Sequence, residues 1–214
     1  MPELELDIVF EDNNLLVVNK PAGVLSQPGK TLDGSIATQV RKAYPKATGS
    51  MLVHRLDMET SGLMILAKDK TSHRHLQQQF ERRLTRKRYV ALLAGQLSGI
   101  GGRITLPLRV DIENRPTQIV CQQHGKSAET LWYKADIDAY KESTNETRVF
   151  FHPVTGRSHQ LRVHAASSQG LGVGIVGDRL YGRAGDRMYL HADQLGFWHP
   201  VTERLIQLTC NAPF

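Results

Sequence analysis

The chain has 214 residues, 40% of them hydrophobic and 22% charged, a balance typical of a globular protein that buries a substantial core in one large domain or in a domain of two lobes. No apolar run approaches the roughly 20 residues that cross a bilayer, and the acidic N-terminal segment lacks the apolar stretch of a signal peptide, so we expect a cytoplasmic protein without membrane segments. The net charge of +6 favours a polyanionic partner, because lysines and arginines that neutralise phosphates release counterions.

The cysteines and histidines form no recognisable metal motif. Cys121 and Cys210 are too few for a disulfide framework and too distant in sequence for a paired zinc knuckle, so both are interpreted as small core residues. His159 and His164 are separated by about 140° around a helix, so they do not share a face. We therefore expect no metal site.

Periodic apolar patterns divide the chain into many short strands and a few helices. In the first part of the chain they predict a hairpin of residues 8–10 and 15–18, a helix within 31–44, a strand at 63–67 and a helix from Thr71 or Ser72 to about Leu84. Strands at 89–93 and 104–108 follow, with a turn at 99–102 between them, and then strands at 128–137 and 147–152. The last elements are a helix at 158–168 and strands at 190–197 and 205–209. Because strands and helices do not alternate regularly, the fold class is α+β.

Two glycine-rich segments resemble nucleotide-binding motifs in their letters alone. Residues 172–177 match the spacing of the dinucleotide fingerprint, but that motif needs a strand before it and a helix after it, whereas here a predicted helix precedes it and a loop follows. Residues 29–31 resemble the end of a phosphate-binding loop, yet Gly23 lies one position too early for the required spacing. Both segments are interpreted as turns, which makes a nucleotide-dependent enzyme a weak hypothesis.

The segment 54–68 (HRLDMETSGLMILAK) places an acidic residue in a charged loop just before an apolar strand. Gly62 lets the backbone turn tightly before that strand, and loops held by a rigid scaffold often carry catalytic side chains. Asp57 is the strongest candidate for such a role. An Asp at this spacing is more often a turn or capping residue, and Arg55 nearby is more often a solvated partner, so spacing alone leaves both interpretations open.

Residues 82–88 (RRLTRKR) form the most basic run of the chain, with five positive side chains in seven positions. Cations at the end of a helix can offset the helix dipole, which would account for part of the run. The remaining charge exceeds what capping needs and favours RNA as the partner.

Seven blocks of sequence, taken in order, resemble the motifs of the RluA family of pseudouridine synthases. The central block is the HRLD and SGL segment at 54–63, followed by an apolar run that ends in Ala-Lys. The other blocks are VVNKPAG at 17–23, KRYVA at 87–91, NRP at 114–116, GKSAET at 125–130, TGRSHQLRVH at 155–164 and LHA at 190–192. They span almost the whole chain, so the ordered set is far more specific than any single motif.

The resemblance implies a single catalytic domain over residues 1–214 with the family's fold, a mixed, mainly antiparallel and bent sheet flanked by helices and loops. It also implies isomerisation of uridine in RNA, in which the bond from base N1 to ribose C1′ breaks, the base rotates, and C5 bonds to C1′. No atoms are gained, so no cofactor is expected. The family's aspartate corresponds to Asp57, and attack at C1′ and at C6 both remain open.

The resemblance assigns further residues to the site. Arg162 would pair with Asp57 and keep that carboxylate ionised and oriented. Tyr89 would stack on the extruded base and help remove the C5 proton, and Arg55 would fill the vacated stack or steady the flipped nucleotide. On the residues alone, Arg162 could equally be an exposed helix residue and Tyr89 a core residue of a strand. Phosphate contacts are expected for Lys20, Arg115, Lys126 and Arg157.

The NRP and GKSAET blocks in so short a chain resemble the dual-specificity branch of the family, which implies stem-loops of large-subunit ribosomal RNA and of tRNA as substrates. No separate N-terminal RNA-binding module is expected, so target choice would come from the catalytic domain and the shape of the RNA. We expect a monomer, because no exposed apolar stripe calls for a partner. The main alternative is a catalytically silent RNA-binding or ribosome-assembly protein with the same fold, and the second is a synthase of the same family with a different RNA target.

Overall fold

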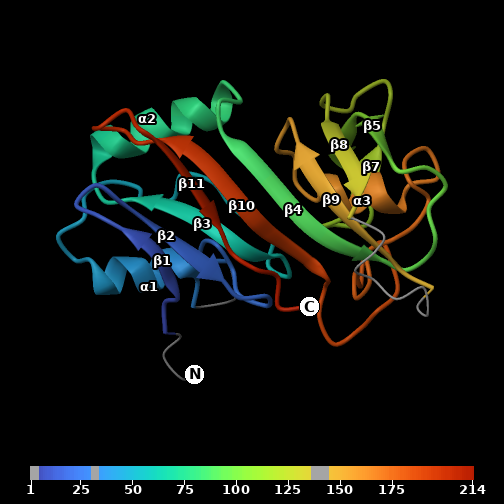
Figure 1. The fold of residues 1–214 in the computed structure, drawn as a ribbon, viewed down its shortest axis with the longest axis horizontal. Coiled ribbons are helices and arrows are strands. Elements are labelled where there is room, and N and C mark those ends of the chain that lie inside the picture. Colours follow the sequence, from blue (N-terminus) through green and yellow to red (C-terminus); the bar gives the residue numbers. More distant parts are fainter. Residues whose placement is uncertain (1–4, 30–33, 136–144) are drawn as a thin grey trace. The chain divides into compact units, whose positions relative to one another are not determined.

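The computed structural model describes residues 5–29, 34–135 and 145–214, and the chain divides into two compact units (Figure 1). The first unit consists of Met1–Lys87 with Ala192–Pro213, and the second of Arg88–His191 with Phe214. The division falls inside two strands, β4 (Arg86–Leu93) and β10 (Leu190–Trp198), so the backbone passes from one unit to the other within regular structure.

The first unit is built on strands whose residues are mostly buried. Its sheet contains, in spatial order, β1 (Ile8–Glu11), β2 (Leu15–Lys20), β3 (Ser61–Ala67) and β10, and β10 also pairs with β11 (Leu205–Thr209). β2 and β3 run antiparallel from the pair Leu15–Ala67 to the pair Lys20–Gly62. Every residue of β3 is buried, so both faces of this strand are covered. It is a rigid base for the loop that precedes it.

Both helices of the first unit begin at side-chain caps. α1 (Ile36–Ala43) follows Ser35, whose hydroxyl accepts a hydrogen bond from the Thr38 N–H. α2 (Lys70–Glu81) follows Asp69, whose carboxylate accepts from both the N–H and the hydroxyl of Ser72. These caps satisfy N–H groups that have no partner inside the first helical turn. Leu76 of α2 packs into a core cluster with Leu15, Val17, Leu63 and Ile65.

The second unit has its own antiparallel strands and one helix. The spatial order is β4, β9 (Thr147–Pro153), β8 (Glu129–Lys134) and β5 (Gly101–Thr105), and a separate pair is formed by β6 (Leu108–Val110) and β7 (Gln118–Val120). α3 (Gln160–Ala166) adds Leu161 and Ala165 to a core that contains Trp132 and Phe151. The helix therefore packs on the face of β8 and β9 that carries these aromatic residues.

The antiparallel strands and the three helices of the described ranges confirm the α+β fold class. Several predicted elements have different bounds, and two of these differences have a clear local cause. The helix predicted from Thr71 or Ser72 to Leu84 is α2, which starts at Lys70 because Asp69 supplies the cap, and Leu84 is exposed beyond its end. The strand predicted at 104–108 is two strands, β5 and β6, on either side of Pro107.

The three-residue strand β7 was not predicted. Parts of two predicted elements, residues 31–33 and 136–137, lie outside the described residues, as do residues 30–31 of the second glycine-rich segment. Among the helices of the described ranges, none is long and apolar enough to cross a membrane.

Candidate active site

Asp57 lies in a loop, residues 52–60, that hydrogen bonds fix to the core of the first unit. The Ile65 N–H in β3 donates to Nε2 of His54 at 3.1 Å, which anchors the start of the loop. The Asp57 carbonyl accepts from the Thr60 N–H at 3.1 Å, which closes a turn directly before β3. The Asp57 side chain is half-buried, so a carboxylate with partial access to solvent is presented from a loop of fixed shape.

Ser26 fixes the residue immediately before Asp57. Its hydroxyl donates to the Leu56 carbonyl at 2.7 Å and accepts from the Leu56 N–H at 3.0 Å. Leu56 is itself buried. Because one side chain holds both backbone groups of Leu56, the direction in which the chain continues to Asp57 is set. No spacing in the sequence links Ser26 to Leu56, and sequence reasoning missed this contact.

Lys20, at the end of β2, is fully buried beneath the same loop. Its ammonium group donates at 2.9, 2.7 and 2.9 Å to the backbone carbonyls of Pro21, Val24 and Met58. Burial lowers the pKa of Lys20 to about 7, and the nearby carboxylates of Asp57 and Glu59 oppose that shift. The expectation that Lys20 binds phosphate is wrong, because its three donors are committed to carbonyls and its surface is inaccessible. Lys20 instead joins β2 to the residue that follows Asp57.

His54 is neutral at ordinary pH. Burial, with a smaller contribution from the positive charge of Lys87, lowers the pKa of His54 to about 3. Its ring stacks on Phe80 of α2 with the centroids 4.4 Å apart. Because Nε2 accepts the Ile65 N–H, the proton is assigned to Nδ1. His54 therefore links the loop of Asp57 to both α2 and β3.

Arg162, on α3 in the second unit, is buried and fixed by an acidic partner. Its Nε and Nη2 donate to the two carboxylate oxygens of Asp178 at 2.8 and 2.7 Å, a bidentate geometry that sets the plane of the guanidinium. Burial alone would raise the pKa of Asp178, but the hydrogen bond and charge of Arg162 and nearby backbone N–H groups lower it below its ordinary value. The ring of Tyr181 lies 5.1 Å from the guanidinium carbon.

The burial of Arg162 and its pairing with Asp178 bear on the predicted site. Arg162 is not an exposed helix residue, since 5% of its surface is accessible. Asp178 was missed, because sequence reasoning treated residues 178–186 as a simple loop; its signal is the single acidic residue that directly follows the glycine-rich segment. Asp57 belongs to the first unit and Arg162 to the second, so the pairing of these two residues stays a prediction.

The segment before α3 is braced by the side chain of Gln160, which is also buried. Its Oε1 accepts from the Thr155 hydroxyl at 2.7 Å and from the Arg157 N–H at 3.0 Å, and its Nε2 donates to the Glu129 carbonyl at 2.8 Å. One amide thus ties the segment to β8. Arg157 is consequently exposed on a loop whose backbone is held in place.

The remaining predicted residues are accessible to different degrees. Tyr89 on β4 is half-buried, pairs in register with Phe151 and packs against the core of the second unit. Arg55, Arg115 and Arg157 are exposed, as a contact with phosphate requires, and so is Lys126. The Nε of Arg157 already donates to the Ser127 carbonyl at 3.0 Å, which orients the guanidinium. The roles of these residues in binding RNA stay predictions.

Two other sequence features serve the fold. His164 is fully buried and bonds to the Thr130 hydroxyl at 2.9 Å and to the Leu106 carbonyl at 3.2 Å, so it is a core histidine. The glycine-rich residues 172–177 follow α3, and within residues 178–214 the elements that come after them are β10 and β11. The segment therefore lacks the strand, turn and helix that a dinucleotide motif needs.

Comparison with known proteins decides the family. Residues 14–167 match the family described as RNA pseudouridylate synthase. The dual-specificity RNA pseudouridine synthase RluA of Vibrio parahaemolyticus is 45% identical over 214 residues, covering 96% of this chain and 83% of that protein. RluA of Escherichia coli is 43% identical over 216 residues, covering 98% of this chain and 94% of that protein. The chain belongs to the RluA family of RNA pseudouridine synthases.

The fold agrees with solved structures of the same kind. The human RNA pseudouridylate synthase domain containing 1 superposes with a TM-score of 0.80 at 29% identity, over 98% of this chain and 84% of that one. The protein is therefore an isomerase that acts on RNA. The bonds from Ser26, Lys20 and His54 fix the loop around Asp57, and the catalytic role of Asp57 stays a prediction.

Proposed function

We propose that this pseudouridine synthase isomerises uridines in stem-loops of both ribosomal RNA and tRNA, with Asp57 as its catalytic carboxylate. One observation carries the catalytic role: Asp57 is half-buried in a loop whose flanking residues are held by Ser26, Lys20 and His54. The dual target is supported by the near full-length similarity to two proteins named dual-specificity RNA pseudouridine synthases.

In this proposal the two units form one catalytic domain, and Asp57, Tyr89 and Arg162 act on the same uridine. Asp57 attacks C1′ or C6, the bond between N1 and C1′ breaks, and the base rotates. C5 then bonds to C1′, the bond to Asp57 breaks, C5 loses its proton to water, and N1 takes up a proton from water. Arg162, oriented by Asp178, keeps the Asp57 carboxylate ionised and directed at the substrate. Tyr89 stacks on the extruded base.

The exposed cationic residues bind parts of the RNA that do not react. Arg55 steadies the flipped nucleotide or fills the place it leaves, and Arg115, Arg157 and Lys126 contact phosphates. The reaction needs no cofactor, because the product is an isomer of the substrate. We further propose that the enzyme works as a monomer in the cytoplasm, where both classes of RNA are found.

The dual target is tested by competition between two transcripts that carry tritium at C5 of uridine, one with a tRNA anticodon stem-loop and one with a stem-loop of large-subunit ribosomal RNA. Both should release tritium to water, because forming the new bond displaces the C5 hydrogen. Each unlabelled stem-loop should inhibit release from the other with an inhibition constant equal to its own KM, since one site serves both. Release from one transcript alone would contradict dual specificity, and release from neither would contradict both proposed targets.

A further inference from the structure

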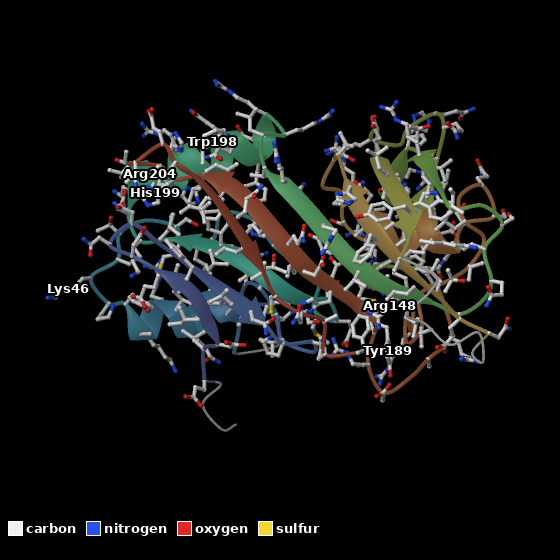
Figure 2. The ribbon with its side chains drawn as sticks, viewed as in Figure 1. Lys46, Arg148, Tyr189, Trp198, His199 and Arg204 are labelled. Carbon is white, nitrogen blue, oxygen red and sulfur yellow. The ribbon has the colours of Figure 1, made fainter. Side chains whose placement is uncertain are left out.

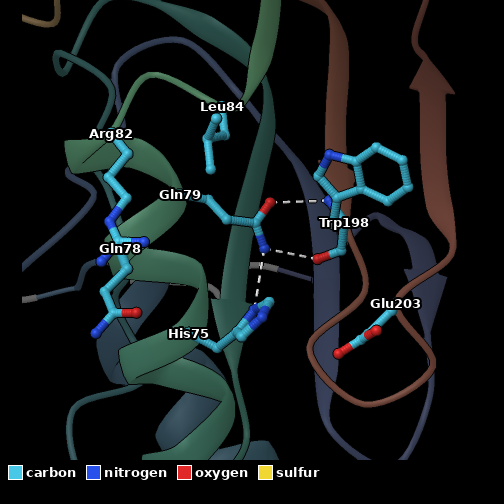
Figure 3. Close-up of a pocket in the computed structure, with 7 residues that line it drawn as sticks. All are labelled: His75, Gln78, Gln79, Arg82, Leu84, Trp198 and Glu203. Atoms are coloured by element: carbon cyan, nitrogen blue, oxygen red, sulfur yellow. Dashed lines mark hydrogen bonds between the residues drawn. The ribbon is translucent and has the colours of Figure 1, made fainter.

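A pocket of about 360 Å³ lies in the first unit, between α2 and the turn that follows β10. Figure 3 shows Arg82, Gln78 and Gln79 on the helix side, with Trp198 and Glu203 on the strand side. A volume of this size is within the range of sites that hold small ligands. Its residues belong to neither the loop of Asp57 nor the segment before α3, so the site described above does not account for it.

The backbone of Trp198 is fixed, and its side chain is exposed. Gln79, which is buried, accepts from the Trp198 N–H at 2.8 Å and donates to the Trp198 carbonyl at 2.7 Å. These two bonds, drawn in Figure 3, fix the end of β10 to α2. Trp198 as a whole residue is 46% exposed. A large aromatic ring on a rigid backbone presents a flat stacking surface at little cost in conformational entropy.

The turn beyond Trp198 is also fixed. Nδ1 of His199 accepts from the N–H groups of Val201 and Thr202 at 3.2 and 3.0 Å, and its Nε2 donates to the Asp12 carboxylate at 2.7 Å. Glu203 follows in the left-handed conformation with φ 54 and lines the pocket. Figure 2 shows Trp198, His199 and Arg204 gathered at this end of the strand pair. The pocket is therefore preformed on its strand side.

Charge around the pocket favours a nucleic acid over a protein. Leu84, Val201 and Leu205 are exposed nearby, so an apolar protein partner is the competing occupant. Arg82 lines the pocket, and three further exposed arginines lie close in sequence to its lining residues, against the acidic Glu81 and Glu203; they are Arg83, Arg86 and Arg204. An exposed aromatic ring next to several arginines matches what single-stranded nucleic acids bind, a stacking face with cations that follow the backbone.

We propose that this pocket is a second RNA-binding site, which takes one unpaired nucleotide of the substrate RNA with its base stacked on Trp198 and its phosphate on Arg82. Glu203 accepts a hydrogen bond from an amino group of the base. Ala192, at the other end of β10, contacts Gly62 at the start of β3. Trp198 lies six residues beyond Ala192 on β10, a distance of about 20 Å at the rise of a strand. A strand of roughly six stacked nucleotides spans the same distance.

The proposal is tested by binding a fluorescein-labelled substrate stem-loop with unpaired flanks to the wild type and to Trp198→Ala, Trp198→Phe and Val201→Ala. Trp198→Ala should raise Kd about 5- to 100-fold, the range expected for losing one stacked base. Trp198→Phe should keep most of the affinity, because a smaller ring still stacks. Val201→Ala, on the same turn but outside the pocket wall, should leave Kd unchanged. Single-turnover rates at saturating RNA should be the same for all four proteins.

Tryptophan fluorescence of the wild type gives a second test, which does not depend on a variant that could misfold. The other tryptophan, Trp132, is buried in the second unit, so quenching of tryptophan emission by saturating RNA should come from Trp198 and vanish in Trp198→Phe. Arg82→Gln should reduce the slope of log Kd against log salt by about one. An unchanged Kd for Trp198→Ala would overturn the proposal, and so would unquenched wild-type emission. A slower single turnover with unchanged Kd would overturn it as well.

Discussion

The ammonium group of Lys20 joins the end of β2 to the loop that carries Asp57. Two of its three carbonyl acceptors, Pro21 and Val24, follow Lys20 closely in sequence. The third, Met58, lies 38 residues further along the chain, in the loop itself. A buried cation is unfavourable unless its hydrogen bonds are satisfied, and here each donor has an acceptor. Lys20 is therefore a positioning residue for the loop, although its motif suggested a phosphate contact.

Replacing Lys20 with Met keeps the length of the side chain and removes all three donors. We expect the free energy of unfolding to fall by about 2–4 kcal/mol, because hydrogen bonds from a charged group are lost and carbonyls stay buried without a partner. Turnover should fall about 10- to 100-fold as the Asp57 loop shifts. Urea unfolding and single-turnover assays measure both, with Lys46→Met as the exposed control (Figure 2). A variant as stable as the control would contradict this role.

His54 gives the fold a contribution that depends on pH. Its pKa is about 3 in the folded protein and 6.5 in the unfolded chain, so between these values the unfolded chain binds a proton that the folded protein does not. The contribution is fully present above pH 6.5 and decreases as the pH falls toward 3, by up to about 1.4 kcal/mol per pH unit.

In His54→Gln, the amide oxygen can still accept the Ile65 N–H but no longer titrates. The variant should therefore lose this part of the acid sensitivity, which urea unfolding at pH 4.5 and 6.5 would measure, while His124→Gln at an exposed position should behave as the wild type. Equal loss of stability on acidification in the wild type and in His54→Gln would show that His54 does not titrate as described.

At the scale of elements, β3 and β10 approach each other so closely at Gly62 that no other residue fits. Gly62 has φ 113, and an added Cβ would collide with the backbone of Ala192. Gly62→Ala should destabilise the protein by clearly more than the roughly 1 kcal/mol of an unfavourable φ alone. Gly99→Ala is the matched control, because Gly99 has φ 88 but nothing within 4 Å of an added Cβ. Similar melting temperatures for the two variants would contradict the close approach.

In the second unit, the pair of Arg162 and Asp178 joins α3 to the segment before β10. Removing one partner of a buried pair leaves the other charge uncompensated, so Asp178→Ala should lower the free energy of unfolding by about 3–5 kcal/mol. Asp186→Ala, at an exposed position nearby, should cost far less. Chemical denaturation compares the two, and equal values would mean that the Arg162 guanidinium is supported by other groups.

Element positions followed from the sequence more readily than their ends did. The helix α2 was predicted to start at Thr71 or Ser72, whereas it starts at Lys70, because the Asp69 side chain caps it. The strands β6 and β7 are too short to produce a periodic signal, so β7 was missed. The strand β3 was predicted from its continuous apolar run, and all of its residues are buried.

At the scale of the whole molecule, the ordered motifs identified the family, and the comparisons confirm it. The motifs did not reveal which charged residues face solvent. Lys20 and Arg157 each lie in a family-like block, yet the first is inside the protein and the second is exposed, and that difference depends on tertiary packing. Ser26 and Asp178 escaped detection for the same reason, since each acts on a residue distant in sequence.

In the proposed mechanism, the Asp57 carboxylate alone among the carboxylates of its loop performs the isomerisation. The most direct test is tritium release from C5-labelled RNA by the wild type, Asp57→Asn and Glu59→Gln, with RNA affinity measured in parallel. Asp57→Asn should release no tritium while its Kd stays close to that of the wild type, because phosphate contacts supply most of the binding. Glu59→Gln removes the other carboxylate of the loop and should retain most of the rate. Tritium release by Asp57→Asn at the wild-type rate would contradict the assignment of Asp57.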